Sequence, residues 1–167
     1  MSYSLLLTLG ALSQLPTFGM AVLNGSITSS TNSTDALPTY SIPNSDPATT
    51  LRFDLASTFS FHPYVLLVAI IEFMQPACHF PYLPFPAHRT FDYMLVRIIL
   101  STIETTSARP MTHNVACIVL RGLAEFMVLI QQFHGWVFSI FVGGTLVGKG
   151  AVIQAPESAV ALGLTSS

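Results

Sequence analysis

The sequence predicts an α+β fold: a small single domain with a C-terminal helix followed by a β-hairpin. Three patterns lead to this prediction. Residues 50–55 alternate between polar and apolar side chains, which is typical of a half-buried strand. Apolar residues follow at helical spacing between Thr112 and Phe133. The pair Gly143-Gly144 then separates two apolar runs and suits the positive φ angles of a two-residue hairpin turn.

The N-terminal segment predicts an export signal. The first 34 residues contain no charged side chain, and the short apolar run Leu5–Leu12 is followed by small residues. We expect cleavage after Ala21, so that residues 1–21 are a signal peptide. The alternatives are an uncleaved membrane anchor or a buried helix, but Pro16 interrupts the apolar stretch well before the about 20 residues that a membrane span needs.

The next segment predicts a linker and two sites of modification. Residues 22–48 are rich in Ser, Thr and Pro, a composition typical of disordered chain. The triplets that begin at Asn24 and Asn32 are N-glycosylation acceptors. Asn32 is the better acceptor, because its triplet ends in Thr and lies further from the cleavage site. The folded domain is expected over residues 49–156, followed by a flexible tail at 157–167.

Two apolar segments occupy the middle of the domain. Pro63 begins the first of them and Pro76 ends it, and Pro at a first helical position predicts a helix. A buried strand is the alternative, because the segment is rich in Val and Ile. Residues 76–90 contain four prolines and are expected to be irregular. The segment Phe91–Ile103 fits a helix or a strand, and we favour the helix.

The stretch from Thr112 to Phe133 predicts the clearest helix, with Thr112 as its N-cap and Gly135 as its C-terminal cap. It is long enough to span a membrane, but Arg121 and Glu125 offset the gain from apolar insertion, so we expect it in a protein core. We interpret these two residues as a structural ion pair on a narrow polar stripe that faces water or a polar groove. The stripe is Asn114, Arg121, Glu125 and Gln132, and the expected core positions are Leu120, Leu123, Phe126, Met127 and Ile130.

The two cysteines, Cys78 and Cys117, allow one disulfide. An even number in an exported protein favours pairing, whereas the apolar surroundings of Cys117 also suit a buried free thiol. The sequence leaves both alternatives open. His79 and His113 could complete a zinc site with them, but no C-x-x-C spacing supports this and adjacent Cys and His chelate poorly, so no metal site is predicted.

Composition and motifs argue against several functions. Charged residues make up 8% of the chain, against about 25% in typical domains, and the net charge is −2. The basic residues are scattered singly, which excludes nucleic-acid binding. So little charge favours self-association or the retention of apolar ligands.

No catalytic motif is present in the sequence. Gly143–Lys149 matches the G-x-x-x-x-G-K phosphate loop, but Gly150 stands where Ser or Thr should hold magnesium, and we interpret the segment as hairpin turn. Neither G-x-S-x-G nor H-E-x-x-H occurs. His88 and Asp92 could meet at i, i+4, but such a pair is usually a surface hydrogen bond rather than a catalytic pair. The sequence therefore predicts no catalytic residue, no cofactor and no enzyme.

Two patches resemble a set of small secreted fungal proteins of unknown function. The first patch is Ile42–Asp46 with the strand Leu51–Leu55 that follows, and the second is Leu120–Phe126 with the closing Gly148–Gly150. The resemblance implies strands between two helices. Because the sequence pattern does not show such strands, it suggests a shortened or unusually spliced chain. No activity or site residue follows from the resemblance.

The expected function is binding at or outside the cell surface. We expect an exported, glycosylated protein without catalytic machinery, whose partners the sequence does not identify. The alternative is a membrane-associated protein that is retained by its apolar N-terminus or by the 113–134 helix.

Overall fold

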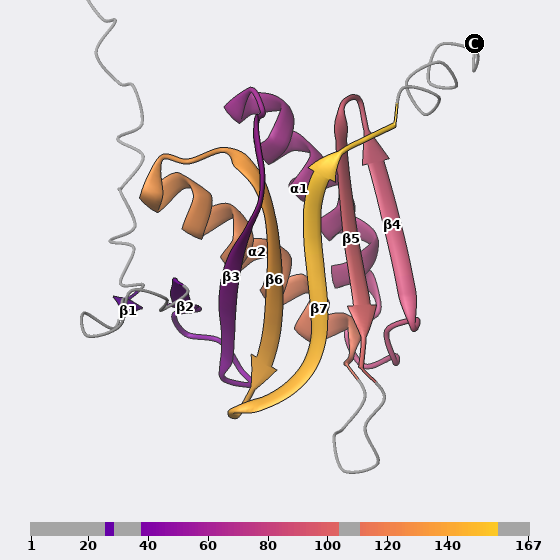
Figure 1. The fold of residues 1–167 in the computed structure, drawn as a ribbon. Helices are drawn as coiled ribbons and strands as arrows, with labels where there is room; N and C mark the ends of the chain where they lie inside the picture. Colours follow the sequence, from indigo (N-terminus) through magenta and orange to yellow (C-terminus); the bar gives the residue numbers. More distant parts are fainter. Residues whose placement is uncertain (1–25, 29–37, 104–110, 157–167) are drawn as a thin grey trace, which may run out of the picture.

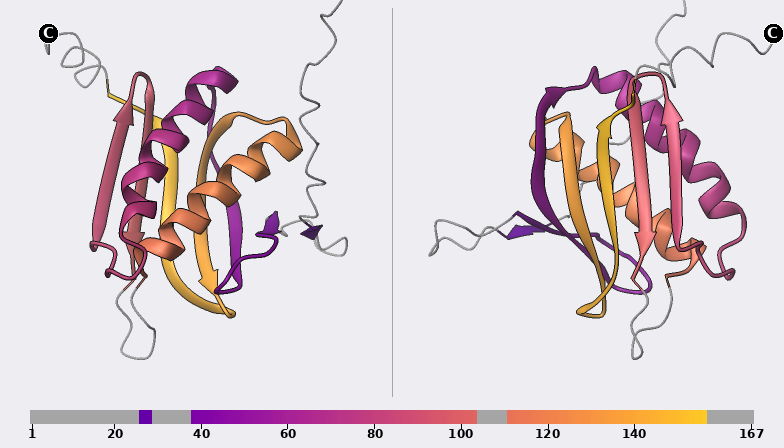
Figure 2. Two further views of the ribbon diagram at one scale, coloured as in Figure 1. Left: turned by 180° about the vertical axis from the view of Figure 1, so that it is seen from behind. Right: turned by 45° about the vertical axis from the view of Figure 1, so that its right-hand side comes forward.

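The structure, a computed structural model, describes residues 26–28, 38–103 and 111–156. Within these residues the chain forms a seven-stranded antiparallel sheet, in the order β1-β2-β3-β6-β7-β5-β4, and two helices. Both helices lie on one face of the sheet, and the other face carries no helix (Figures 1 and 2). The elements are β1 (Ser26–Thr28), β2 (Thr39–Ser41), β3 (Thr49–Ser60), α1 (Pro63–His79), β4 (His88–Tyr93), β5 (Val96–Thr102), α2 (His113–Ile130), β6 (His134–Val142) and β7 (Thr145–Gln154).

The predicted fold class, a small domain that ends in a helix and a hairpin, is wrong. Both helices lie in the middle of the chain, and the last two strands form the centre of the sheet rather than an appended hairpin. β6 pairs with β3, and β7 pairs with β5, over most of their lengths. A local pattern identifies a strand but not the distant strand beside it, which is why the sequence pattern missed this pairing.

The segment predicted as a linker, residues 22–48, contains two strands, β1 and β2. β2 extends the sheet beyond β3 and places Tyr40 in the core, where none of its surface is exposed. Ile42 follows it, is also buried, and lies directly against Gly122 of α2. The composition of this segment is dominated by Ser, Thr and Pro, so it gave no indication of these two buried residues. Tyr40 and Ile42 nevertheless pack this segment against the core.

Helix α1 begins at Pro63, as predicted, but it does not end at Pro76. It continues to His79, because a proline in the last turn removes only one backbone hydrogen bond. The buried residues recur at helical spacing and face the sheet and α2: Leu66, Ala69, Ile70, Phe73 and Ala77.

The helix favoured for Phe91–Ile103 is wrong, because this region is the hairpin of β4 and β5. Met94 adopts a left-handed conformation (φ 51°) at the turn between them. Val96, Ile98 and Leu100 are buried, but Ile99 between them is apolar as well, and this hides the period-two pattern. In the chain, β4 and β5 follow α1 and precede α2. The apparent lack of strands between the two helices, which suggested a shortened chain, is therefore wrong.

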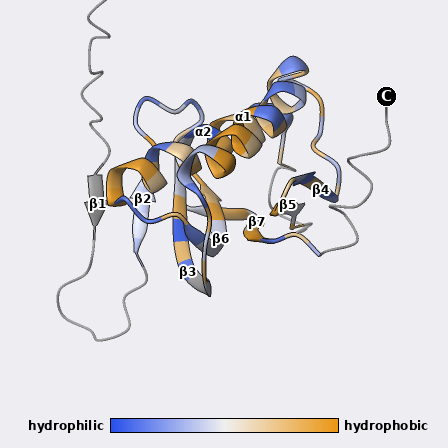
Figure 3. Cartoon of the chain, turned by 90° about the horizontal axis from the view of Figure 1, so that it is seen from above, coloured by the Kyte–Doolittle hydropathy of each residue, from blue (hydrophilic) through white to orange (hydrophobic). Residues whose placement is uncertain are grey.

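Helix α2 packs in the core, with Thr112 as its N-cap. The Thr112 hydroxyl accepts a hydrogen bond from the Val115 N–H at 3.3 Å, and the helix ends at Ile130, before Gln131 turns to φ 55°. Its predicted core positions Leu120, Leu123, Phe126 and Met127 are buried, and Ile130 is partly buried. Phe126 stacks on Phe53 of β3 at 3.8 Å between ring centres. Among the described helices α2 alone is long and apolar enough to cross a membrane, and 56% of it is buried in the fold; hydrophobic residues cover much of both helices where they lie along the sheet (Figure 3).

Three residues of the predicted polar stripe, Asn114, Arg121 and Glu125, lie against β2 and the segment that joins it to β3, whereas Gln132 lies beyond the end of α2. Arg121 and Glu125 form an ion pair at 3.7 Å, and both are partly exposed. The stripe therefore holds a neighbouring segment in place instead of only facing water. Its hydrogen bonds run from Tyr40 Oη to Glu125 Oε2 (3.2 Å), from Arg121 Nη2 to the Pro43 carbonyl (3.4 Å) and from Asn114 Nδ2 to the Asp46 carbonyl (3.1 Å).

Candidate binding site

A hollow of about 460 Å³ lies where the end of α1, the start of α2 and the edge strand β4 meet. α1 and β4 follow one another in the chain, whereas α2 begins more than twenty residues after Arg89. The packing of both helices on the sheet brings the start of α2 beside the other two elements (Figure 2). Polar and aromatic side chains share the lining. It consists of Gln75, Pro76, His79, Phe80, Arg89 and His113.

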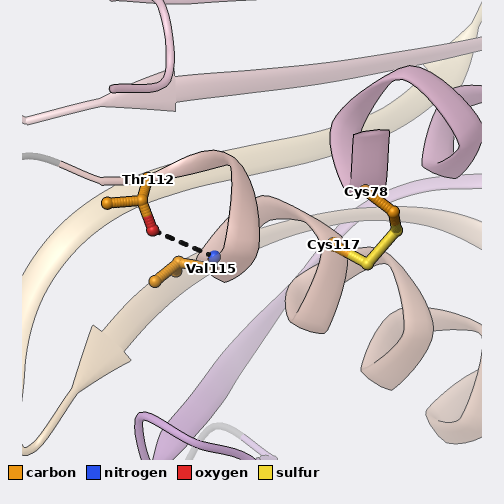
Figure 4. Close-up of a disulfide and its surroundings, with 4 residues drawn as sticks. All are labelled: Cys78, Thr112, Val115 and Cys117. Atoms are coloured by element: carbon orange, nitrogen blue, oxygen red, sulfur yellow. Dashed lines mark hydrogen bonds between the residues drawn. A yellow bond between two sulfur atoms is a disulfide. The ribbon is translucent and has the colours of Figure 1, made fainter. Parts of the chain in front are cut away.

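A disulfide between Cys78 and Cys117 joins the two helices beside this hollow (Figure 4). Their Cα atoms are 5.1 Å apart, and the bond closes a loop of 39 residues. A cross-link over such a loop lowers the entropy of the unfolded chain and stabilises the fold by about 4 kcal/mol in the chain-entropy model. It also takes both thiols out of any zinc site. Among the described residues no three His, Cys, Asp or Glu side chains gather as metal ligands.

Two histidines beside the disulfide line the hollow. His79 follows Cys78 directly, and His113 precedes Cys117 by one helical turn. The Phe80 ring meets the His79 ring edge-on at 4.5 Å and is 54% exposed. One wall of the hollow is therefore an accessible aromatic surface.

His113 is buried, with 7% of its surface exposed, and it is the first residue of α2. Its ring lies 5.1 Å from the ring of Phe85. Its Nδ1 atom is buried and has no hydrogen-bond partner in the described part of the chain. Two further buried nitrogens, of His134 and Trp136, also lack described partners, but neither residue lines this hollow.

Arg89 brings a positive charge from β4. Alternate residues of this strand face the helices, and Phe91, two residues further along, stacks on Phe73 of α1 at 5.3 Å. The Arg89 guanidinium lies over the same Phe73 ring, with its carbon 6.0 Å from the ring centre. Within the described ranges the ion pairs are Arg97–Asp92 and Arg121–Glu125, so no described carboxylate neutralises Arg89. No Asp or Glu lines the hollow either.

The backbone at the start of α2 is already satisfied. The proline-rich segment before β4, predicted to be irregular, folds back and provides carbonyl acceptors there. A ligand in the hollow would therefore contact side chains rather than free helix N–H groups. The first N–H groups of α2 donate as follows: His113 to the Leu83 carbonyl, Asn114 to the Pro81 carbonyl, Val115 to Thr112 Oγ1 and Ala116 to the Thr112 carbonyl.

The remaining candidate residues do not gather at this hollow. Asn24 and Asn32 lie outside the described residues, as do the whole of the predicted signal peptide and the whole of the predicted tail. His88 and Asp92 lie on a strand, not a helix, and the expected bond between them is not formed. His88 Nδ1 lies 2.8 Å from Ser101 Oγ, while Asp92 pairs with Arg97 at 2.7 Å and this hydrogen bond lowers the pKa of the Asp92 carboxyl.

The segment that matches a phosphate loop is the turn between β6 and β7. Gly143 and Gly144 have φ angles of 56° and 81°, as the turn interpretation requires. Lys149 lies further along β7, on the face of the sheet without helices. There it joins Arg52 and Asp54 around a smaller hollow of about 240 Å³.

Sequence reasoning did not single out Arg89, Gln75 or Phe80. Their proximity depends on the pairing of β4 with β5 and on the position of α1 over the sheet, and neither is visible in a local pattern. A usable indication was the spacing of His79 and His113 around the two cysteines, provided that the cysteines pair.

Comparison with protein-family models, with curated proteins and with solved structures found no match. The resemblance to small secreted fungal proteins therefore stays a prediction.

Proposed function

We propose that this chain is an exported binding protein that takes a small organic molecule into the hollow beside the Cys78–Cys117 disulfide. The observation that carries the proposal is the combination of shape and lining. The volume of about 460 Å³ falls within the roughly 300–1,000 Å³ of small-molecule sites, and the hollow is open to solvent rather than enclosed. An accessible aromatic ring lines it together with a few polar groups, Gln75, His79, Arg89 and His113.

Export is supported by two independent features. The apolar, uncharged N-terminus has the pattern of a signal peptide. The disulfide beside the hollow suits an oxidising compartment, because thiols are kept reduced in the cytosol. A ligand-binding role requires no catalytic residues, in agreement with the motifs that the sequence lacks.

The test is a binding assay with three small probes: benzoate, benzamide and benzylamine. Amide chemical shifts of the labelled, disulfide-bonded protein are followed during titration. At least one probe should shift the signals of His79, Arg89 and His113. Gln75→Trp places a large ring at the hollow and should abolish these shifts.

The matched control is Gln132→Trp, which adds the same ring at an exposed position beyond the end of α2. This variant should bind like the wild type. The proposal fails if no probe shifts the signals around the hollow, or if Gln75→Trp binds as well as the control.

A further inference from the structure

We infer that the ligand of this hollow is an organic anion, a carboxylate carried on a flat apolar body; this inference rests on the proposed function. The charge of the lining is the first reason. Arg89 has no described counter-ion, and His79 and His113 are the other titratable groups of the lining. A guanidinium presents donors in a planar fork that matches a carboxylate, so an anion is the complementary occupant.

The same lining disfavours a cation or a metal ion. Both cysteine sulfurs are bonded to each other, and the two histidines share the hollow with a permanent positive charge. A metal ion or an ammonium group would be repelled by Arg89 without a carboxylate to compensate. A lining that combines His79 and His113 with Arg89 therefore suits an anion better than a metal ion.

The second part of the ligand follows from the aromatic wall. Phe80 is 54% exposed beside the polar groups, and Pro76 adds a further apolar surface. Exposed aromatic faces bind flat rings in offset or edge-on arrangements. A carboxylate at Arg89 and a ring against Phe80 account for both halves of the lining, which a compact inorganic anion would not.

Affinities for four probes test the inference: benzoate, benzamide, benzylamine and inorganic phosphate, in a buffer free of other carboxylates. Benzoate should bind at least about tenfold more tightly than benzamide, which has the same ring without the charge. Benzylamine and phosphate should bind more weakly still. If benzoate and benzamide bind equally well, the inference that the ligand is an anion is overturned. If benzoate and phosphate bind equally well, the inference that the ligand has a flat apolar body is overturned.

Variants of Arg89 identify the group responsible. Arg89→Gln should weaken benzoate binding roughly 10- to 100-fold and leave benzamide unchanged. Arg89→Lys keeps the charge but lacks the planar guanidinium, so its affinity for benzoate should lie between those of the wild type and Arg89→Gln. Arg52→Gln, which removes a cation from the helix-free face, is the matched control and should bind like the wild type.

The buried histidine is tested with His113→Phe, which keeps a flat ring and removes both nitrogens. It should weaken benzoate binding by about tenfold, while thermal unfolding verifies that the variant is folded. Arg89→Gln and His113→Phe variants that are folded and bind benzoate like the wild type would overturn the inference. If none of the organic probes binds, the proposed function itself is wrong. If benzamide binds as well as benzoate, the proposed function stands and only the inference of an anionic ligand is wrong.

Discussion

Tyr40 shows how a single side chain ties an outer strand to the core. None of its surface is exposed, its ring lies 5.7 Å from that of Phe126, and its hydroxyl donates to Glu125. Burial, and then the neighbouring Glu125 carboxylate, raise the pKa of Tyr40 to about 12. The phenol is therefore neutral in the fold over a wider range of pH than in the unfolded chain.

This raised pKa predicts how stability changes in alkali. The folded pKa lies above the ordinary value of 10.0, so the unfolded chain loses the phenol proton first and the fold becomes less stable as pH rises from 10 towards 12. Tyr40→Phe should remove this part of the loss. Urea denaturation of both proteins at pH 9 and pH 11 measures it; equal losses in the two proteins would show that Tyr40 is not responsible.

At the scale of elements, α2 is the element that organises the molecule. It packs on the sheet and on α1, holds the β2–β3 connection through its polar stripe, and begins at the hollow. Its one glycine, Gly122, is buried in the helix interior, where a Cβ atom would overlap the side chain of Ile42. This close approach lets the segment after β2 lie directly on the helix.

A second prediction follows from this contact. Through its higher helix propensity, Gly122→Ala alone should add about 1 kcal/mol to the free energy of unfolding. Because the added methyl group overlaps Ile42, we expect the measured free energy of unfolding to fall instead, by roughly 1–3 kcal/mol. In an Ile42→Ala background the same substitution should become neutral or stabilising. A double-mutant cycle by urea denaturation measures the coupling, and strictly additive effects would contradict the contact.

Elements with a clear local pattern could be predicted, and elements that depend on distant partners could not. Thr112 at the start of α2 and Pro63 at the start of α1 act through neighbouring backbone, so their positions were visible. β5 carries isoleucine on both faces, and β2 carries one buried tyrosine in polar sequence, so neither pattern stood out. The candidate site could not be predicted for the same reason, because Arg89 and His113 line one hollow only in the folded chain.

For the whole molecule, the third prediction concerns its route to the outside of the cell. In a eukaryotic secretory host we expect the protein in the medium, with Val22 as its first residue and with Asn32 glycosylated more often than Asn24. N-terminal sequencing and peptide mass spectrometry after glycosidase treatment measure both. Secreted protein that still begins at Met1 would contradict the cleaved signal, and carbonate-resistant membrane association would favour the alternative of a retained protein.

The β4 edge of the described sheet has a consequence for the addition of further strands. Charge is scarce along the chain, at 8% of residues, yet β4, the last strand of the described sheet, carries Arg89 and Asp92 within six residues. Charged side chains on an edge strand oppose the addition of further strands. We therefore expect Arg89, which faces the helices, and the Asp92–Arg97 ion pair to disfavour a continuous sheet that grows from β4.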